Sequence, residues 1–301
     1  MDLLGRFAYM LLLVAVGLGA RRFGVLTGAR NRRLSQLAFY IFLPALIFTS
    51  TNDRRLGAIL SVELGAVTVA TITILLALAW VVNLGGTDET RSVALVQSYH
   101  GNLGFFGLPV VATTLGSDAA ATASVILGLG ALVQTPLTVL VLVSITDADA
   151  TLASELRSLA TNPVLLTLGL ALAFSTLGVS VPTAVDAGLG RLSTFALPTA
   201  LVAVGGSLDV VTSDVPLGRI GRVVGLKTVV MPLVAWLLFS GLGVDPLTRN
   251  AGVVMFGAPT AVATYIYAAE LGGDERFASV NVFATTVAAI GSLFVLLQFL
   301  T

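Results

Sequence analysis

The chain reads Phe106-Gly107-Leu108-Pro109 in its first half and Phe256-Gly257-Ala258-Pro259 in its second half, 150 residues apart. Each tetrapeptide interrupts a hydrophobic segment near its middle. Proline lacks an amide donor and clashes with the preceding turn, and glycine loosens the backbone. In lipid the freed backbone groups need protein, water or a ligand as partners. Paired interruptions of this kind are typical of the binding site of a secondary transporter, so the sequence predicts a carrier of a small solute.

Composition places the chain in a membrane. Hydrophobic residues make up 56% and charged residues 11%, and the mean hydropathy is +0.98. Soluble domains carry about 25% charged residues, so this chain cannot cover an ordinary water-facing surface. A net charge of zero without a basic run gives no reason to expect nucleic acid as a partner. We expect a multi-pass protein of the cell membrane with no soluble domain.

Chemistry-bearing residues are scarce. The chain has no cysteine, which excludes disulfides and thiolate metal sites, and a single histidine leaves no cluster for zinc. The sequence contains no His-Glu-x-x-His, no Gly-x-Ser-x-Gly and no phosphate-binding loop. We therefore predict that the protein is not an enzyme and uses no metal or cofactor.

Apolar stretches near the roughly 20 residues that cross a bilayer recur along the chain. This pattern predicts an all-α membrane protein with ten transmembrane helices. The predicted spans are 3–21, 33–51, 58–82, 90–114, 119–144, 157–178, 188–208, 217–242, 246–270 and 276–300.

Further correspondences between the two halves support an internal repeat. Leu115-Gly116-Ser117-Asp118 matches Leu271-Gly272-Gly273-Asp274, and Leu43-Pro44 in the second span matches Leu197-Pro198 in the seventh. Gly, Pro and Phe are common in membrane helices, but several matches in the same order make chance a poor explanation. Five spans per half is odd, so we predict two inverted five-helix repeats, residues 1–150 and 151–301.

Arginines set the predicted orientation. Ten lie beside loops that follow odd-numbered spans, and five lie on the other side. The first loop dominates this bias, so we expect it in the cytoplasm and both termini outside. Binding of anionic lipid is an alternative role for the same arginines.

The two interruptions define the candidate site. A break near Gly107 and Pro109, and a second at Gly257 and Pro259, would leave two half-helix N-termini facing each other at the membrane centre, which favours an anion. Asn102 precedes the first break and could orient a carboxylate, or else tie two helices together. No Asp or Glu occurs within residues 91–109 or 251–269. Cation exchangers usually need such carboxylates, so cation exchange is not expected.

Five other residues are candidates for the substrate site. His100 could couple protons or contact substrate, or it could be a neutral, hydrogen-bonded histidine. Lys227, in the eighth span, could neutralise the substrate or mimic a bound cation, or could snorkel to the interface. Gln134 and Asn281 could face the crossing or join helices. Tyr265 could line an aromatic pocket or anchor at the interface.

At these residues the sequence resembles the auxin efflux carrier family of the bile acid/auxin transporter superfamily. The resemblance rests on Asn102 through Pro109 in the fourth span, on Pro259 through Leu271 in the ninth, and on Leu43 through Phe48 in the second. Its short motifs gain specificity from their order and spacing over nearly the whole chain. Leu271 stands where the family often has tyrosine, a departure from the pattern.

The resemblance implies a sodium/proton-antiporter-like fold with crossed, broken helices 4 and 9. Spans one, two, six and seven would form a scaffold and a dimer interface, and the other spans a transport domain that moves as an elevator. It implies small organic anions as substrates, either auxin-like or dicarboxylate. Two alternatives stay open: a sodium-coupled organic-anion symporter of the bile-acid-transporter type, and a membrane solute sensor that does not transport.

Overall fold

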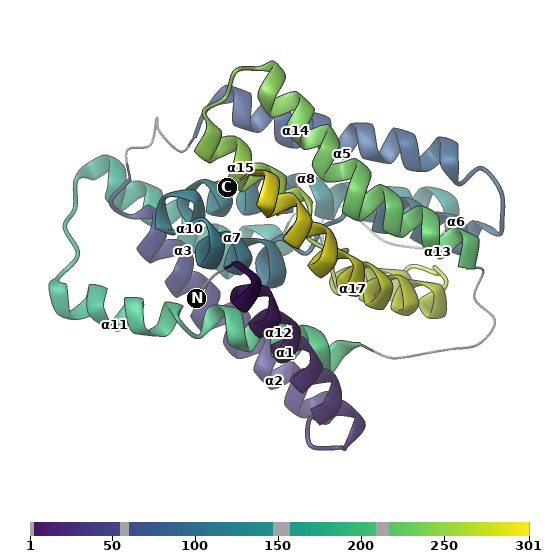
Figure 1. The fold of residues 1–301 in the computed structure, drawn as a ribbon, viewed down its shortest axis with the longest axis horizontal. Coiled ribbons are helices and arrows are strands. Elements are labelled where there is room, and N and C mark those ends of the chain that lie inside the picture. The colour runs from purple at the N-terminus through teal and green to yellow at the C-terminus, as the bar shows by residue number, and fades with distance from the viewer. Residues whose placement is uncertain (1–2, 55–59, 147–156, 209–216, 301) are drawn as a thin grey trace.

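The computed structural model describes residues 3–54, 60–146, 157–208 and 217–300 (Figure 1). Every regular element in these ranges is helical, which confirms the all-α prediction. The elements are α1 (Leu3–Arg22), α2 (Gly28–Leu37), η1 (Ala38–Phe42), α3 (Leu43–Thr51), α5 (Val62–Val82), α6 (Asp88–Tyr99), η2 (Leu103–Gly107), α7 (Leu108–Thr114), α8 (Ser117–Thr146), α10 (Pro163–Leu177), α11 (Thr183–Ser193), α12 (Ala196–Ser207), α13 (Leu217–Gly225), η3 (Leu226–Val230), α14 (Met231–Gly241), α15 (Pro246–Phe256), α16 (Ala263–Glu270) and α17 (Glu275–Leu300).

Seven helical stretches within the described ranges are long and apolar enough to cross a membrane. They are Leu3–Arg22, Gly28–Thr51, Val62–Val82, Ser117–Thr146, Thr183–Ser207, Leu217–Gly241 and Glu275–Leu300. Two shorter apolar helices, Leu103–Thr114 and Pro163–Leu177, add to them. The protein is therefore a multi-pass membrane protein, while the count of ten spans stays a prediction.

Three prolines determine where the helices widen. The π-helical turns η1, η2 and η3 each end two residues before a proline: Pro44, Pro109 and Pro232. In each case the residue just before the proline donates its amide to the carbonyl five residues back. A proline ring clashes with the carbonyl four residues back, and the wider turn relieves this clash without ending the helix.

We name one set of helices the outer group: α1, α2, η1, α3, α10, α11 and α12. Within it α1 and α2 pack on α12, and α3 packs on α10 and α11. The crossing of α1 and α12 is close because both helices carry glycine there. A Cβ on Gly17 would overlap the Val202 carbonyl oxygen, and one on Gly205 would overlap that of Val14. Small residues at helix crossings let membrane helices approach closely.

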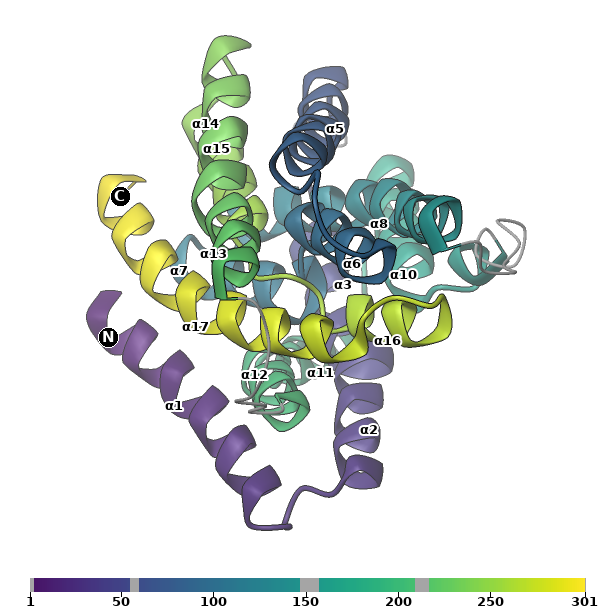
Figure 2. The ribbon, with the colours of Figure 1, turned by 90° about the vertical axis from the view of Figure 1, so that its right-hand side faces the viewer.

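The remaining helices form a second set, which we name the crossing group: α5, α6, η2, α7, α8 and α13 through α17. Here α8 packs on α6, α7 and α15, and α14 packs on α5 and α15. Figure 2 shows α5 and α14 on the side of the molecule away from α1 and α2. The two groups meet along α3 and α8 and along α12 and η2. Each group draws helices from both halves of the chain.

Candidate functional site

The first broken span is interrupted at His100–Asn102. Helix α6 ends at Tyr99, His100 is extended, and Asn102 is the N-cap of η2. The predicted break near Gly107 and Pro109 is therefore wrong. Gly107 ends η2 and Pro109 lies in the first turn of α7, inside a continuous stretch of helix. The π-helical turn accommodates the proline, so no break is needed there.

The second broken span is interrupted later in its own motif. Helix α15 ends at Phe256 and α16 begins at Ala263, so Gly257 and Pro259 lie between the half-helices, as predicted from the sequence. The two similar tetrapeptides consequently occupy different structural positions. Both breaks contain a glycine, Gly101 and Gly257, and these are 156 residues apart, as are Leu115 and Leu271.

The two breaks bind each other through the main chain. The amide of Asn102 donates to the Pro259 carbonyl at 2.7 Å, and the amide of Ala261 donates to the His100 carbonyl at 3.0 Å. The Thr260 hydroxyl donates to the same His100 carbonyl at 3.2 Å. Gly101 and Thr260 form a short antiparallel bridge. The amides of Asn102 and Ala261 and the carbonyls of His100 and Pro259 thus find partners inside the protein, as a low-dielectric environment favours.

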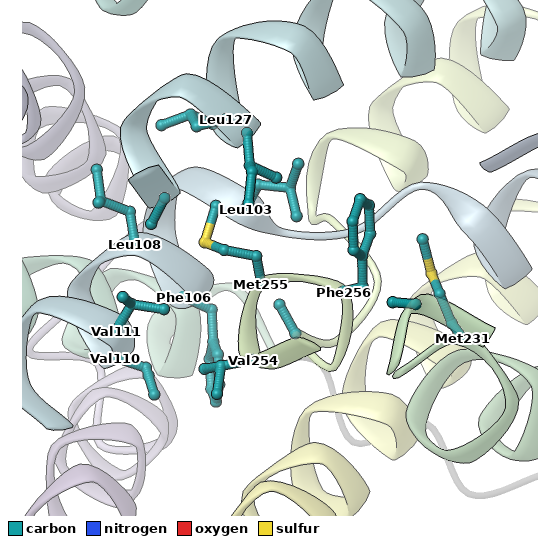
Figure 3. Close-up of a cluster of buried hydrophobic side chains, with 14 of the residues drawn as sticks. Leu103, Phe106, Leu108, Val110, Val111, Leu127, Met231, Val254, Met255 and Phe256 are labelled. Atoms are coloured by element: carbon teal, nitrogen blue, oxygen red, sulfur yellow. The ribbon is translucent and has the colours of Figure 1, made fainter. Parts of the chain in front are cut away.

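Apolar side chains fix the two spans against each other around this bridge. Figure 3 shows Met255 of α15 extending toward Leu103 of η2, with Phe106 beside Val254. All of these side chains are buried. A Cβ on Gly107 would lie only 2.9 Å from the Met255 sulfur. Gly107 therefore acts in packing, since a larger residue would push the spans apart.

A cavity of about 310 Å³ lies beside the bridge, between the outer and crossing groups. Its walls come from α2, η1, α3, α8, η2, α12, α16 and the start of α10. The described lining residues include no Asp, Glu, Lys or Arg. The polar ones are Ser35, His100, Asn102, Gln134, Thr135, Asn162 and Ser207.

Asn102 is the main polar group of this cavity. Its side chain is 5% exposed, and its Oδ1 accepts a hydrogen bond from the Phe105 amide at 3.1 Å, which caps η2. Its Nδ2 is not among the fully buried polar atoms, and it has no acceptor among the described residues. The same holds for the amides of Gly104, Val262 and Ala263, which line the cavity at the starts of two half-helices. The cavity is therefore supplied with unused donors.

His100 and Gln134 line the same cavity and are held by neighbours. The His100 Nδ1 lies 2.8 Å from the Thr138 hydroxyl, which also lies 3.1 Å from the Tyr99 hydroxyl. Gln134 Nε2 donates to the Tyr99 carbonyl at 3.4 Å. Since α8 carries both Gln134 and Thr138, this helix orients the residues that precede the first break.

Lys227 lies behind the bridge, outside the residues that line the cavity. It is completely buried, so it does not snorkel to the interface. Its Nζ donates to the Phe256 carbonyl at 2.9 Å and to the Met231 sulfur at 3.2 Å. A Cβ on Gly101 would lie 3.2 Å from the same Nζ. The ammonium therefore lies at the C-terminal end of α15, where the helix dipole favours a cation.

The other predicted site residues lie away from the cavity lining. Asn281 is buried and donates to Gln97 Oε1 at 2.9 Å, so it joins α17 to α6. Tyr265 on α16 is 37% exposed and does not line the cavity. Pro109 is buried in α7. The structure thus brings His100, Asn102 and Gln134 together, and does not bring the rest to the same cavity.

Sequence reasoning missed the polar residues that the outer group supplies. Ser35 and Ser207 come from α2 and α12, and Asn162 caps α10 through a bond of 2.9 Å from the Val164 amide to its Oδ1. Asn162 is followed by Pro163, a pair that marks a helix start. That signal could have placed the beginning of α10 at Pro163 rather than at residue 157.

The family model described as "Membrane transport protein" matches residues 3–152 and 148–297, which together cover nearly the whole chain. The chain belongs to this family. The resemblance to auxin efflux carriers is thereby confirmed. As a member of the membrane transport protein family, the protein is a membrane transporter.

Two curated relatives are similar over most of their length. A protein of Rhizobium meliloti (strain 1021) with the name "Putative malonate transporter" is 23% identical over 268 residues, which are 86% of this chain and 84% of the relative. The "Uncharacterized transporter MJ1031" of Methanocaldococcus jannaschii is 25% identical over 288 residues, 92% of each chain. Both names describe transporters, in agreement with the family.

Proposed function

We propose that the protein carries a small organic anion, which binds in the cavity beside the bridge between the two broken spans. The single observation that carries this proposal is Asn102, which lines the cavity among described residues that bear no charge, and whose Nδ2 has no protein acceptor among the described residues. A donor that lines a cavity without a protein acceptor can bond a ligand that offers an acceptor. An organic carboxylate is such an acceptor.

Backbone dipoles add to the preference for an anion. The helical stretch that begins at Asn102 and the helix α16 both start at the cavity, and each helix N-terminus carries roughly half a positive elementary charge. The free amides of Gly104, Val262 and Ala263 lie in these first turns. This arrangement attracts a carboxylate without a buried arginine, as helix N-termini do in other anion sites.

The rest of the wall suits a carbon skeleton. Phe39, Leu43, Leu127 and Ile266 line it with apolar surface. A volume of about 310 Å³ is at the lower end of ordinary ligand sites, so the proposed substrate is small. Malonate is the first anion to test, because one relative carries that substrate in its name.

Movement of the crossing group against the outer group would carry the site across the membrane, in an elevator-type mechanism of two inverted repeats. In support, the cavity lies between these two groups and not inside either one. Helix α11 of the outer group has no buried residue, which supports a homodimer that forms through this group. We retain the predicted orientation, with both termini outside the cell.

Thermal stabilisation by ligand tests the proposed site. The purified protein is heated with a panel of organic anions, with and without sodium, and compared with Asn102→Ser. Serine still caps the helix but lacks the amide donor. We expect an anion at a hundredfold excess over its Kd to stabilise the wild type by about 2.7 kcal/mol and the variant far less. Equal thermal stabilisation of both proteins would show that the anion does not bind at Asn102. Stabilisation that requires sodium would favour a sodium-coupled symporter.

A further inference from the structure

Arg6 joins the outer group to the first broken span. It lies in α1, and its Nη1 donates to the carbonyls of Thr113 and Thr114 at 2.5 and 3.2 Å. These carbonyls belong to the last turn of α7, where no intrahelical donor remains. A guanidinium is well placed there, since it satisfies the carbonyls and complements the negative end of the helix dipole.

Arg54 makes the corresponding link to α8. It follows α3, and its Nη2 lies 2.7 Å from Asp118 Oδ1 and 3.3 Å from the Ser117 hydroxyl. Both acceptors lie in the first turn of α8. The Ser175 hydroxyl of α10 donates to the Arg54 carbonyl, so the residue is also held from the outer group. The Arg54 side chain is 29% exposed and the Asp118 side chain 62%, so solvent and salt screen this ion pair.

The acceptors of the two arginines lie within six consecutive residues, from Thr113 to Asp118. The contacts join the N-terminal end of α1 and the C-terminal ends of α3 and α10 to the C-terminal end of α7 and the start of α8. Four polar side-chain contacts between described residues join the two groups, and Arg6 or Arg54 makes each of them.

The cavity lies at the N-terminal end of α10, whereas Ser175, near the C-terminal end of the same helix, holds Arg54. Its outer-group lining comes from Ser35 in α2, from Asn162 at the start of α10 and from Ser207 at the end of α12. No residue of the described ends held by the two arginines lines it. Side chains therefore join the two groups near the C-terminal end of α10, and the cavity separates them near its N-terminal end.

We propose that Arg6 and Arg54 form a latch that keeps the crossing group closed against the outer group at this end, so that the cavity faces the other side of the membrane. The inference rests on the proposed alternating movement of the two groups. Transfer of the site to the latch side requires the contacts with Thr113, Thr114, Ser117 and Asp118 to break. The two arginines are positioning residues and do not touch the substrate.

Single introduced cysteines test the latch without any substrate, because the chain has no cysteine of its own. Ser35→Cys reports on the cavity, which it lines, and Thr51→Cys reports on the latch end of α3, where Thr51 is completely buried. The rate of maleimide labelling is measured for each reporter with and without Arg6→Gln and Arg54→Gln together. We expect labelling at position 35 to slow and labelling at position 51 to accelerate, each by about fivefold.

The opposite signs separate a change of state from a loss of folding, which would accelerate both reactions. Arg249→Gln is the matched control, because the Arg249 side chain bonds the adjacent Asn250 and not the outer group. Unchanged labelling at both positions in the double variant would overturn the latch, and so would acceleration at both. Anion binding by the same variants is measured separately, so failure of the latch and failure of the anion site give different results.

Discussion

The amide of Asn102 donates to the carbonyl of Pro259 at 2.7 Å, so the two broken spans are joined through main-chain atoms at the centre of the protein. The Asn102 side chain takes no part in this main-chain bond. One of its polar atoms caps η2 and the other faces no protein acceptor within the described residues. Suitable substitutions can therefore separate the role of Asn102 in capping η2 from its proposed role in binding the anion.

The cap at Asn102 predicts different stabilities for two variants. Asn102→Ala loses the bond to the Phe105 amide, and loss of an N-cap costs about 1 kcal/mol. Asn102→Ser keeps a capping oxygen, so its free energy of unfolding is expected to lie within a few tenths of a kcal/mol of the wild-type value. Chemical or thermal unfolding in detergent measures both. Equal losses of stability in the two variants would show that capping is not what the side chain contributes.

Lys227→Met is expected to leave the melting temperature unchanged or higher. It is also expected to reduce transport at least about tenfold, because the Lys227 Nζ holds the Phe256 carbonyl at the end of α15, next to the second break. Burial of an ammonium without a carboxylate partner is costly, and methionine removes that cost while it fills the same volume. The substitution also removes the hydrogen bond from the Lys227 Nζ to the Phe256 carbonyl, and leaving that carbonyl without a donor costs about 1–3 kcal/mol. Flux and melting curves are recorded on the same preparations. A large fall in stability with normal flux per folded protein would assign Lys227 to folding alone.

Gly17→Ala is expected to destabilise the protein by about 1–3 kcal/mol, because the new methyl group would overlap the backbone of α12. Gly19→Ala in the same helix is the matched control, since nothing lies within 4 Å of its Cβ position. Alanine also favours a helix over glycine, so the control is expected to be neutral or slightly stabilised. Equal effects at both positions would show that α1 and α12 have room to separate.

Pro109→Ala is expected to leave ligand binding within about twofold of the wild type, a change below 0.5 kcal/mol. Pro109 lies inside the helix that follows the break and does not line the cavity. The break itself is held by the bonds between Asn102 and Pro259 and between Ala261 and His100. Titration of the stabilising anion against both proteins measures this. Loss of ligand binding in the variant would show that Pro109 contributes to the binding site.

Much of the fold follows from local sequence. The predicted ranges 3–21, 119–144 and 276–300 agree with α1, α8 and α17 to within two residues at each end, because apolar length is a property of each segment alone. The existence of two interrupted spans was likewise predicted from the glycines and prolines of the two tetrapeptides.

The position of the first break was not readable in the same way. Pro109 looks like the stronger breaker, but a π-helical turn absorbs it. The break forms instead at Gly101, where the chain pairs with Thr260, a contact between residues 159 positions apart in the sequence. Asn102 was predicted from its proximity to the motif and Gln134 as a polar residue of the fifth span, whereas Ser35 and Asn162 were not predicted. Only the packing of the outer group brings those two to the cavity.

The most direct test of the anion site is flux in proteoliposomes loaded with unlabelled malonate, measured as uptake of labelled malonate by the wild type and by Asn102→Ser. We expect exchange by the wild type above the level of empty liposomes, and a rate at least about tenfold lower in the variant, which corresponds to roughly 1.4 kcal/mol of lost interaction. If malonate gives no exchange, the same assay is run with the anion that stabilises the protein most. Equal rates for the two proteins with a transported anion would contradict binding at Asn102.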